Sequence, residues 1–178
     1  MKLTYLVSAL FLTFTTLSCN RNNDQDHDHD HLDNLQLISY SDDFEVFAEA
    51  TPFAVGHESE ILAHFTHLEN FKPLESGSVT ANLVVDNDTV SQTLDSPTRP
   101  GVFRFILKPR EKGEAKLLFN VKISGKISQL TVEGITVFTD LNDAIHAAED
   151  AVITSSNGAV FTKEQSWKVD FATEEIRK

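Results

Sequence analysis

The residues best suited to chemistry lie near the N-terminus, where carboxylate and imidazole side chains alternate. They are Asp26, His27, Asp28, His29, Asp30 and His31. Imidazole nitrogen binds Zn²⁺, Cu²⁺, Ni²⁺ and Co²⁺, and neighbouring carboxylates add oxygen ligands and negative charge. Because ordering a flexible chain costs entropy, we expect modest affinity. We therefore predict transient binding of a divalent cation by these six side chains, with no firmly bound cofactor; the alternative is an inert, solvated spacer.

The residues before this stretch predict an exported lipoprotein. Lys2 precedes an uncharged, proline-free apolar run from Leu3 to Leu17. The run is shorter than the ~20 residues of a transmembrane helix and is typical of a signal peptide, here residues 1–18. Leu17-Ser18-Cys19 is similar to a lipobox, so we expect Cys19 to carry acyl chains that anchor the protein to a membrane. The alternative is an ordinary signal peptide followed by an unmodified cysteine.

A disordered tether is predicted to follow the anchor, over residues 19–40. Residues 20–34 contain one arginine and five aspartates and almost no apolar side chains. Such a segment cannot bury enough apolar surface to fold. We expect a lipoprotein of a Gram-negative cell envelope that faces the periplasm, with exposure on the cell surface as the alternative.

Composition narrows the classes of function. The net charge of −12 argues against nucleic acid as a partner, because a phosphate-binding surface needs clustered Lys and Arg. The one cysteine lies in the export signal, and the one methionine is Met1, so a methionine-thioether metal site is excluded. No phosphate loop, nucleophile elbow or HExxH motif is present. We predict that the protein is not an enzyme; an exported hydrolase is the weaker alternative.

The body of the chain reads as short strands separated by turns. Alternating apolar residues predict strands over 44–49, 61–68, 79–85, 90–94, 103–107, 115–123, 127–132 and 135–138. Turns are expected at 86–88, 96–101 and 124–126, with a β-bulge at Gly134. This pattern predicts an all-β fold, an immunoglobulin-like β-sandwich over 41–139. A short helix over 141–150, capped by Asp140, follows within 140–153. Residues 154–178 read as a linker and the start of a further domain.

Four histidines lie outside the tail, and we predict structural or solvated roles for all of them. His64 and His67 are three residues apart on a predicted strand, where side chains of odd spacing point to opposite faces. They therefore cannot share one metal ion on a regular strand. His57 falls in a predicted loop and His146 on the polar side of the predicted helix.

Four segments of the chain carry a resemblance to a known family. They are FEVFAEATPFAVGHESEILAHFTHLENFKPLESGSVTANL (44–83), PTRPGVFRFILKP (97–109), DAIHAAED (143–150) and FTKEQSWKVDFAT (161–173). They resemble the N-terminal part of periplasmic adaptor subunits, or membrane fusion proteins, of RND-type heavy-metal efflux systems of the copper/silver and cobalt–zinc–cadmium kind. The resemblance covers roughly residues 40–175, and some of these adaptors similarly begin with a lipobox cysteine and a His/Asp-rich stretch.

The resemblance implies a β-sandwich module of an adaptor that bridges a proton-driven inner-membrane pump and an outer-membrane channel. The sequence ends at Lys178, so we expect the adaptor's α-helical hairpin, lipoyl-like domain and β-barrel to be missing. We expect a lipid-anchored component of heavy-metal efflux that binds or hands over divalent metal, with the pump, the channel or other adaptor chains as partners. The alternatives are a non-catalytic module that binds a protein through a strand edge, and an inactive adaptor fragment without a metal role.

Overall fold

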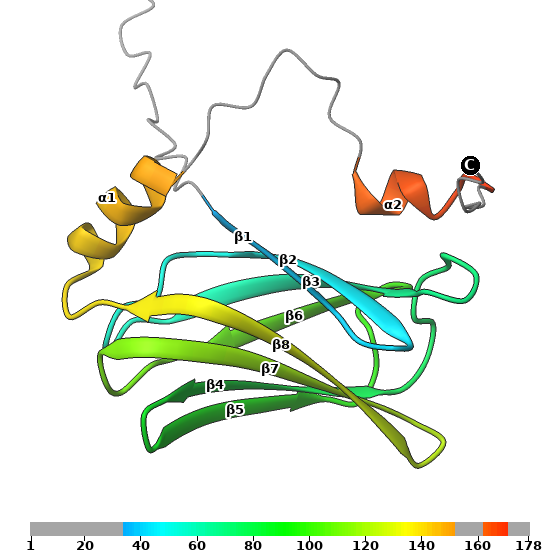
Figure 1. Cartoon of the computed structure of the whole chain (residues 1–178), viewed down its shortest axis with the longest axis horizontal. Helices are drawn as coiled ribbons and strands as arrows, with labels where there is room; N and C mark the ends of the chain where they lie inside the picture. Colours follow the sequence, from blue (N-terminus) through cyan, green and yellow to red (C-terminus); the bar gives the residue numbers. More distant parts are fainter. Residues whose placement is uncertain (1–33, 152–161, 171–178) are drawn as a thin grey trace, which may run out of the picture. The chain divides into compact units, whose positions relative to one another are not determined.

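The structure, a computed structural model, describes residues 34–151 and 162–170. Two antiparallel sheets, with strand orders β1-β2-β3-β6 and β5-β4-β7-β8, form the body of these residues (Figure 1). The elements are β1 (Leu35–Tyr40), β2 (Phe44–Ala50), β3 (Ser59–His67), β4 (Ser78–Val85), β5 (Asp88–Leu94), β6 (Val102–Leu107), β7 (Gly113–Ile123), β8 (Lys126–Val137), α1 (Leu141–Ala151) and α2 (Lys163–Ser166). The all-β prediction is confirmed.

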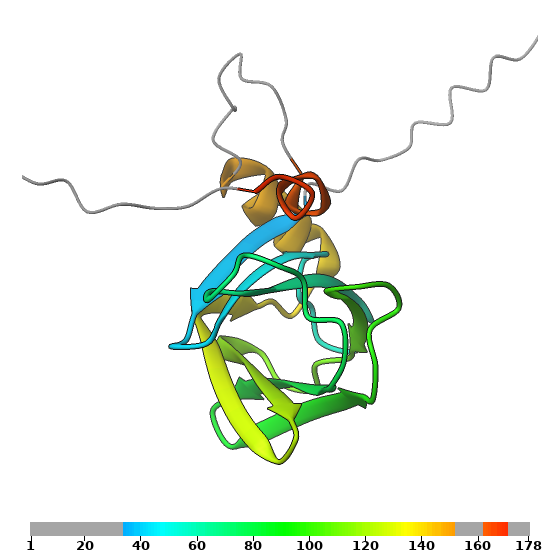
Figure 2. The same cartoon turned by 90° about the vertical axis from the view of Figure 1, so that its right-hand side faces the viewer.

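Phenylalanine rings join the two sheets through a shared core. Phe65 of β3 packs edge-on against Phe103 of β6 in its own sheet and against Phe119 of β7 in the facing sheet, with ring centroids 5.5 Å apart in both pairs. Such edge-to-face pairs add to the stabilisation from burying the rings. Figure 2 shows the two sheets as opposite layers. The period-two alternation seen in the sequence therefore points the apolar side of each sheet inward.

The predicted turns and bulge are confirmed. Ser124 and Gly125 connect β7 to β8 with φ of 48° and 87°, as a type I′ hairpin turn requires. The pairing of β7 with β8 shifts by one residue between Ala115 and Leu117. Gly134, with φ of 75°, lies opposite this shift. The extra residue lies on β8, and it keeps the apolar side chains on both sides of the bulge pointing into the core.

The expected tether was too long at its C-terminal end. Residues 35–40 form β1, which pairs with β2 from Leu35–Ala50 to Tyr40–Glu45. Leu37 is buried in the core, and the Ser39 hydroxyl donates to the carbonyl of Thr131 on β8. The strand was missed because Leu35 and Leu37 give only a short apolar alternation that directly follows a polar segment. The predicted signal peptide and the rest of the predicted tether lie outside the described residues.

The predicted helix is α1, and its N-terminus is capped as expected. The backbone N–H of Asn142 donates to Asp140 Oδ1 at 2.8 Å. Ala144 and Ala148 form its buried face. In the described part of the chain, no helix is long and apolar enough to cross a membrane.

Candidate functional site

The six predicted metal ligands and Cys19 lie outside the described residues, so their roles stay predictions. Within residues 34–151 and 162–170, no three His, Cys, Asp or Glu side chains gather closely enough to hold a metal ion. The prediction that His64 and His67 face opposite sides of a strand is confirmed: the His67 ring lies 4.7 Å from the ring of Phe44 in the core, whereas His64 lies on the outer face. His57 and His146 are exposed, as expected.

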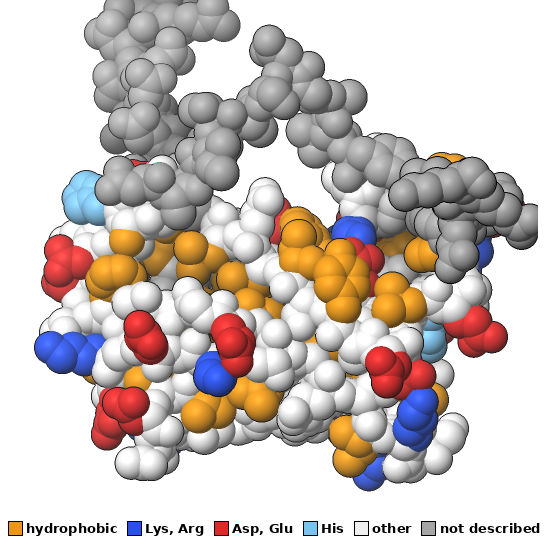
Figure 3. All heavy atoms as spheres, viewed as in Figure 1, with side chains coloured by type: hydrophobic (Ala, Val, Ile, Leu, Met, Phe, Trp, Pro, Cys, Tyr) orange, Lys and Arg blue, Asp and Glu red, His pale blue; other side chains and the backbone are white. Residues whose placement is uncertain are grey.

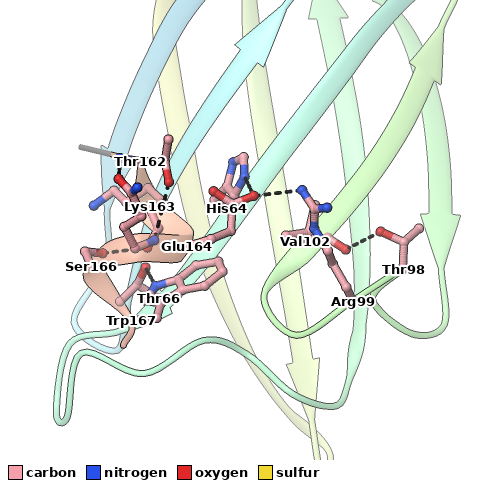
Figure 4. Close-up of polar contacts among 11 residues, drawn as sticks. His64, Thr66, Thr98, Arg99, Val102, Thr162, Lys163, Glu164, Ser166 and Trp167 are labelled. Carbon is pink, nitrogen blue, oxygen red and sulfur yellow. Dashed lines mark hydrogen bonds and ion pairs between the residues drawn. The ribbon is translucent and has the colours of Figure 1, made fainter. Parts of the chain in front are cut away.

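The densest group of polar and aromatic contacts forms where residues 162–170 dock on the outer face of the β1-β2-β3-β6 sheet (Figure 4). We call residues 162–170 the latch. Its first turn is α2, which begins with a capping box: Thr162 Oγ1 accepts from the Gln165 N–H, and Gln165 Oε1 accepts from the Thr162 N–H. This reciprocal pair satisfies two backbone donors at the start of the helix and fixes the direction in which the latch approaches the sheet.

Trp167 is the anchor of the latch. Its side chain is buried, and its indole N–H donates to Thr66 Oγ1 on β3 at 2.8 Å. The ring lies so close to Gly101 that an added Cβ there would be 2.4 Å from it and 2.8 Å from Pro73. Truncating a buried Trp costs about 3–5 kcal/mol in protein cores, far more than an exposed ion pair contributes. Gly101 is therefore required by its neighbours as well as by its φ of 78°.

Three ion pairs surround this anchor. Lys163 Nζ lies 2.6 Å from Glu45 Oε1 on β2, and Glu164 Oε1 lies 2.7 Å from Arg99 Nη2 in the loop before β6. Lys72 Nζ lies 2.7 Å from Asp170. The Lys163–Glu45 pair is the least exposed of the three, while the aspartate of the last pair is almost fully solvated. Solvent screening makes the outer pairs weak, so they select the docking orientation more than they add affinity.

His64 is buried at the centre of the contact, between the rings of Phe47 and Trp167 at centroid distances of 6.0 and 5.9 Å. Its Nε2 lies 3.3 Å from Glu164 Oε1, within ion-pair range. In the described part of the chain, neither ring nitrogen makes a hydrogen bond of good geometry. Among the described residues, no hydroxyl or thiol is hydrogen-bonded to His64, and its nearest charged neighbour is the Glu164 carboxylate. The arrangement is that of a docking contact.

The two carboxyl groups of the latch favour their charged forms. Burial alone raises the pKa of Glu164, but a hydrogen bond from its own backbone N–H, together with His64 and Arg99, outweighs burial and lowers that pKa below 4.5. The hydrogen bond and charge of Lys72 lower the pKa of Asp170 below 3.8. Ionised carboxylates therefore favour the docked latch.

A groove of about 800 Å³ runs between β1 and β8 beneath α1. Its floor includes Leu37, Phe53 and Ile135, and the helix contributes Ala144 and Ala148. Figure 3 shows hydrophobic side chains gathered on this face of the molecule. The groove separates two strand edges, which makes it a second candidate for binding.

The sequence interpretation missed the latch. Residues 154–178 were expected to be a linker and the start of a further domain, and residues 162–170 fold back onto the outer face of the β1-β2-β3-β6 sheet. The predicted linker, residues 154–158, lies outside the described residues, and the further domain stays a prediction. Two signals were present in the sequence: the T-K-E-Q capping box at Thr162, and the single tryptophan of the chain in an otherwise polar segment.

The structure also relates the segments that carry the resemblance. Segments 44–83, 97–109 and 161–173 supply both sides of the latch contact through Thr66, Gly101 and Trp167. Comparison of the chain with models of known protein families, with curated proteins and with solved structures finds no match.

Proposed function

We propose that this chain is a lipid-anchored component of heavy-metal cation efflux in the bacterial envelope, and that it binds or hands over divalent metal through its Asp/His tail. The observation that carries the metal role is the alternation of three aspartates and three histidines over residues 26–31, soon after the predicted lipidated Cys19. Among the described residues, no group of three or more His, Cys, Asp or Glu side chains could hold a metal ion, whereas six such residues follow one another in the tail. The link to efflux rests on the resemblance to RND adaptors.

The docked latch supports treating three of the segments that carry the resemblance as parts of one structural unit. Thr66 and Arg99 each contact latch residues that lie more than 60 residues further along the chain, at a single site. In the proposed function, the latch fixes residues 162–170 on the domain.

The strand order supports an immunoglobulin-like class for the domain. With β1 set aside, strands β2 to β8 correspond in order to strands A to G. The constant-type arrangement places A, B, E and D in one sheet and C, F and G in the other. Strands β2, β3 and β6 share one sheet, and β4, β7 and β8 share the other. Only β5 departs from this arrangement, because it pairs with β4 instead of β6.

The test is metal tolerance of the native bacterial host. We compare cells that make the wild-type chain, a Cys19→Ala variant, or a variant with His27, His29 and His31 changed to Ala. We expect both variants to lower tolerance to at least one of Zn²⁺, Cu²⁺, Ni²⁺ and Co²⁺, and Cys19→Ala to release the protein from the membrane fraction. His57→Ala is the matched control and should retain wild-type tolerance. Unchanged tolerance to all four metals in both variants contradicts the proposal.

A second candidate function is a protein-binding module, favoured by the groove between β1 and β8. Ile38 and Tyr40 on β1 are 53% and 62% exposed, and β1 has β2 as its only strand neighbour within the described residues. A free strand edge beside an apolar groove suits an added strand. Pull-down of the purified pump and outer-membrane channel by this chain, with Ile38→Lys as the control, separates this function from metal binding.

A further inference from the structure

The latch is recognised by side chains of the domain, in a defined order along the sequence. Lys163 faces Glu45, Glu164 faces Arg99, and Asp170 faces Lys72. Trp167 lies between these pairs, on Thr66 and Gly101. We call Glu45, His64, Thr66, Lys72, Arg99 and Gly101 the latch seat. A segment that fits the latch seat must carry a cation, an anion one residue later, a tryptophan three residues after the anion, and a second anion three residues after the tryptophan.

The latch seat is shaped by bonds within the domain itself. Gly101 donates its backbone N–H to the carbonyl of Leu74 and accepts from the N–H of Phe65, both at 2.8 Å. Leu74 in turn donates to the carbonyl of Phe65 at 3.0 Å. Glu45 and Thr66 face each other across the β2–β3 pair. Because these bonds do not involve the latch, we expect the seat to keep its shape when the latch leaves.

We propose that the latch seat is a peptide-recognition site that also accepts the latch of a second copy of this chain. A second copy fits the seat because its residues 162–170 carry the same Lys163, Glu164, Trp167 and Asp170. Exchange between copies preserves every contact, which is the condition for low-cost domain swapping. The proposal does not depend on a role in metal efflux.

Local concentration decides whether the seat holds its own latch or that of a neighbour. Within one chain, the connection through residues 152–161 raises the effective concentration of the latch at its seat. The outer ion pairs are solvent-screened, with Arg99 61% and Asp170 96% exposed, so the contact relies on Trp167. At high protein concentration we therefore expect latches to exchange and dimers to accumulate.

Peptide binding to a chain with a vacant seat tests the recognition step. The full chain with Trp167→Ala is titrated with a fluorescent peptide of residues 161–171, and circular dichroism verifies that the sheets are folded. We expect saturable binding to this variant, and about tenfold or more weaker binding to the wild-type chain, whose own latch competes. A peptide with Ala in place of Trp167 is the control. Equal binding of both peptides to the folded variant overturns the proposal.

Charge reversal tests whether the seat reads the sequence of the latch. Arg99→Glu in the Trp167→Ala chain should reject the wild-type peptide and bind a peptide carrying Glu164→Arg. Failure of the reversed pair to restore binding overturns sequence-specific recognition.

Sedimentation of the full wild-type chain tests the occupant. We expect a dimer fraction that grows with protein concentration and is absent from the Trp167→Ala variant. A wild-type chain that stays monomeric throughout, although its seat binds the peptide, overturns the second copy as the occupant.

Discussion

Trp167 and Gly101 show how one close approach organises the candidate site. The tryptophan is the only one in the chain, so its fluorescence reports directly on the latch. It is buried against a glycine that could not carry a side chain without moving the ring. Trp167 is not part of the core between the sheets, so we expect the latch to detach without unfolding them and the stability lost with Trp167 to be limited to the free energy of docking.

Gly101→Ala is expected to expel the latch. Its added Cβ would lie 2.4 Å from the Trp167 ring, and the emission of Trp167 should shift to the red as the ring enters water. Gly56→Ala is a matched control, because Gly56 has φ of 76° against 78° for Gly101 and has nothing within 4 Å of its added Cβ. Both variants carry similar backbone strain, about 1–2 kcal/mol. An identical emission spectrum for the two variants contradicts the account of Gly101.

Acidification is expected to weaken the docking of the latch. The pKa values of Glu164 and Asp170 are lowered in the docked state, from ordinary values of 4.5 and 3.8. Their contribution to docking is therefore complete above those ordinary values and is lost as pH falls through the lowered pKa values. The emission of Trp167 between neutral pH and about pH 3 measures this weakening, while circular dichroism follows the sheets.

Glu164→Gln is the control for the effect of acid. We expect this variant to show weaker docking at neutral pH and a smaller change on acidification, because one of the two titrating carboxylates is gone. An emission spectrum of the wild-type chain that does not change at low pH, on sheets that remain folded, argues against a contribution of the carboxylates to docking.

At this scale the sequence predicted some residue environments and missed others. The opposite faces of His64 and His67 follow from strand geometry alone. The burial of His64 does not, because the ring that covers it comes from Trp167, about a hundred residues further along the chain. Local pattern carries no information on such a contact.

Among the elements, β1 (Leu35–Tyr40) is the first strand of the described domain. A chain that starts at residue 34 should unfold at the same temperature as the mature chain, because it retains β1. A chain that starts at residue 41 should lose about 2–4 kcal/mol, from the burial of Leu37 and the partial burial of Leu35. Thermal and urea unfolding measure both. Equal stability of the two truncated chains contradicts a structural role for β1.

Most strands could be predicted from alternating apolar residues and from the residue types in the turns. The two elements that were missed share one cause. Strands β2 to β8 are rich in alternating apolar residues, and their turns carry Gly, Asp or Asn. Strand β1 is only six residues long and follows a polar tail, and α2 is a single turn. Both are held by tertiary contacts, to β2 and to β3, which no local pattern encodes.

On the scale of the whole molecule, the chain joins a folded domain to an N-terminal stretch of different chemistry. The chain carries a net charge of −12, and the predicted ligands Asp26 to His31 add to the negative field that attracts cations. The described domain contributes two sheets, a capped helix and a docked latch, but no cluster of three metal-ligating side chains. We propose that the tail is the part of this protein that binds metal.

Calorimetric titration of the mature chain with Zn²⁺, Cu²⁺, Ni²⁺ and Co²⁺ tests this assignment most directly. The comparison is with a variant in which His27, His29 and His31 are changed to Ala, and with a control in which His57 and His146 are changed instead. We predict that the binding heat for at least one metal disappears in the tail variant and persists in the control. Equal heats for the mature chain and the tail variant would contradict the tail as the metal site.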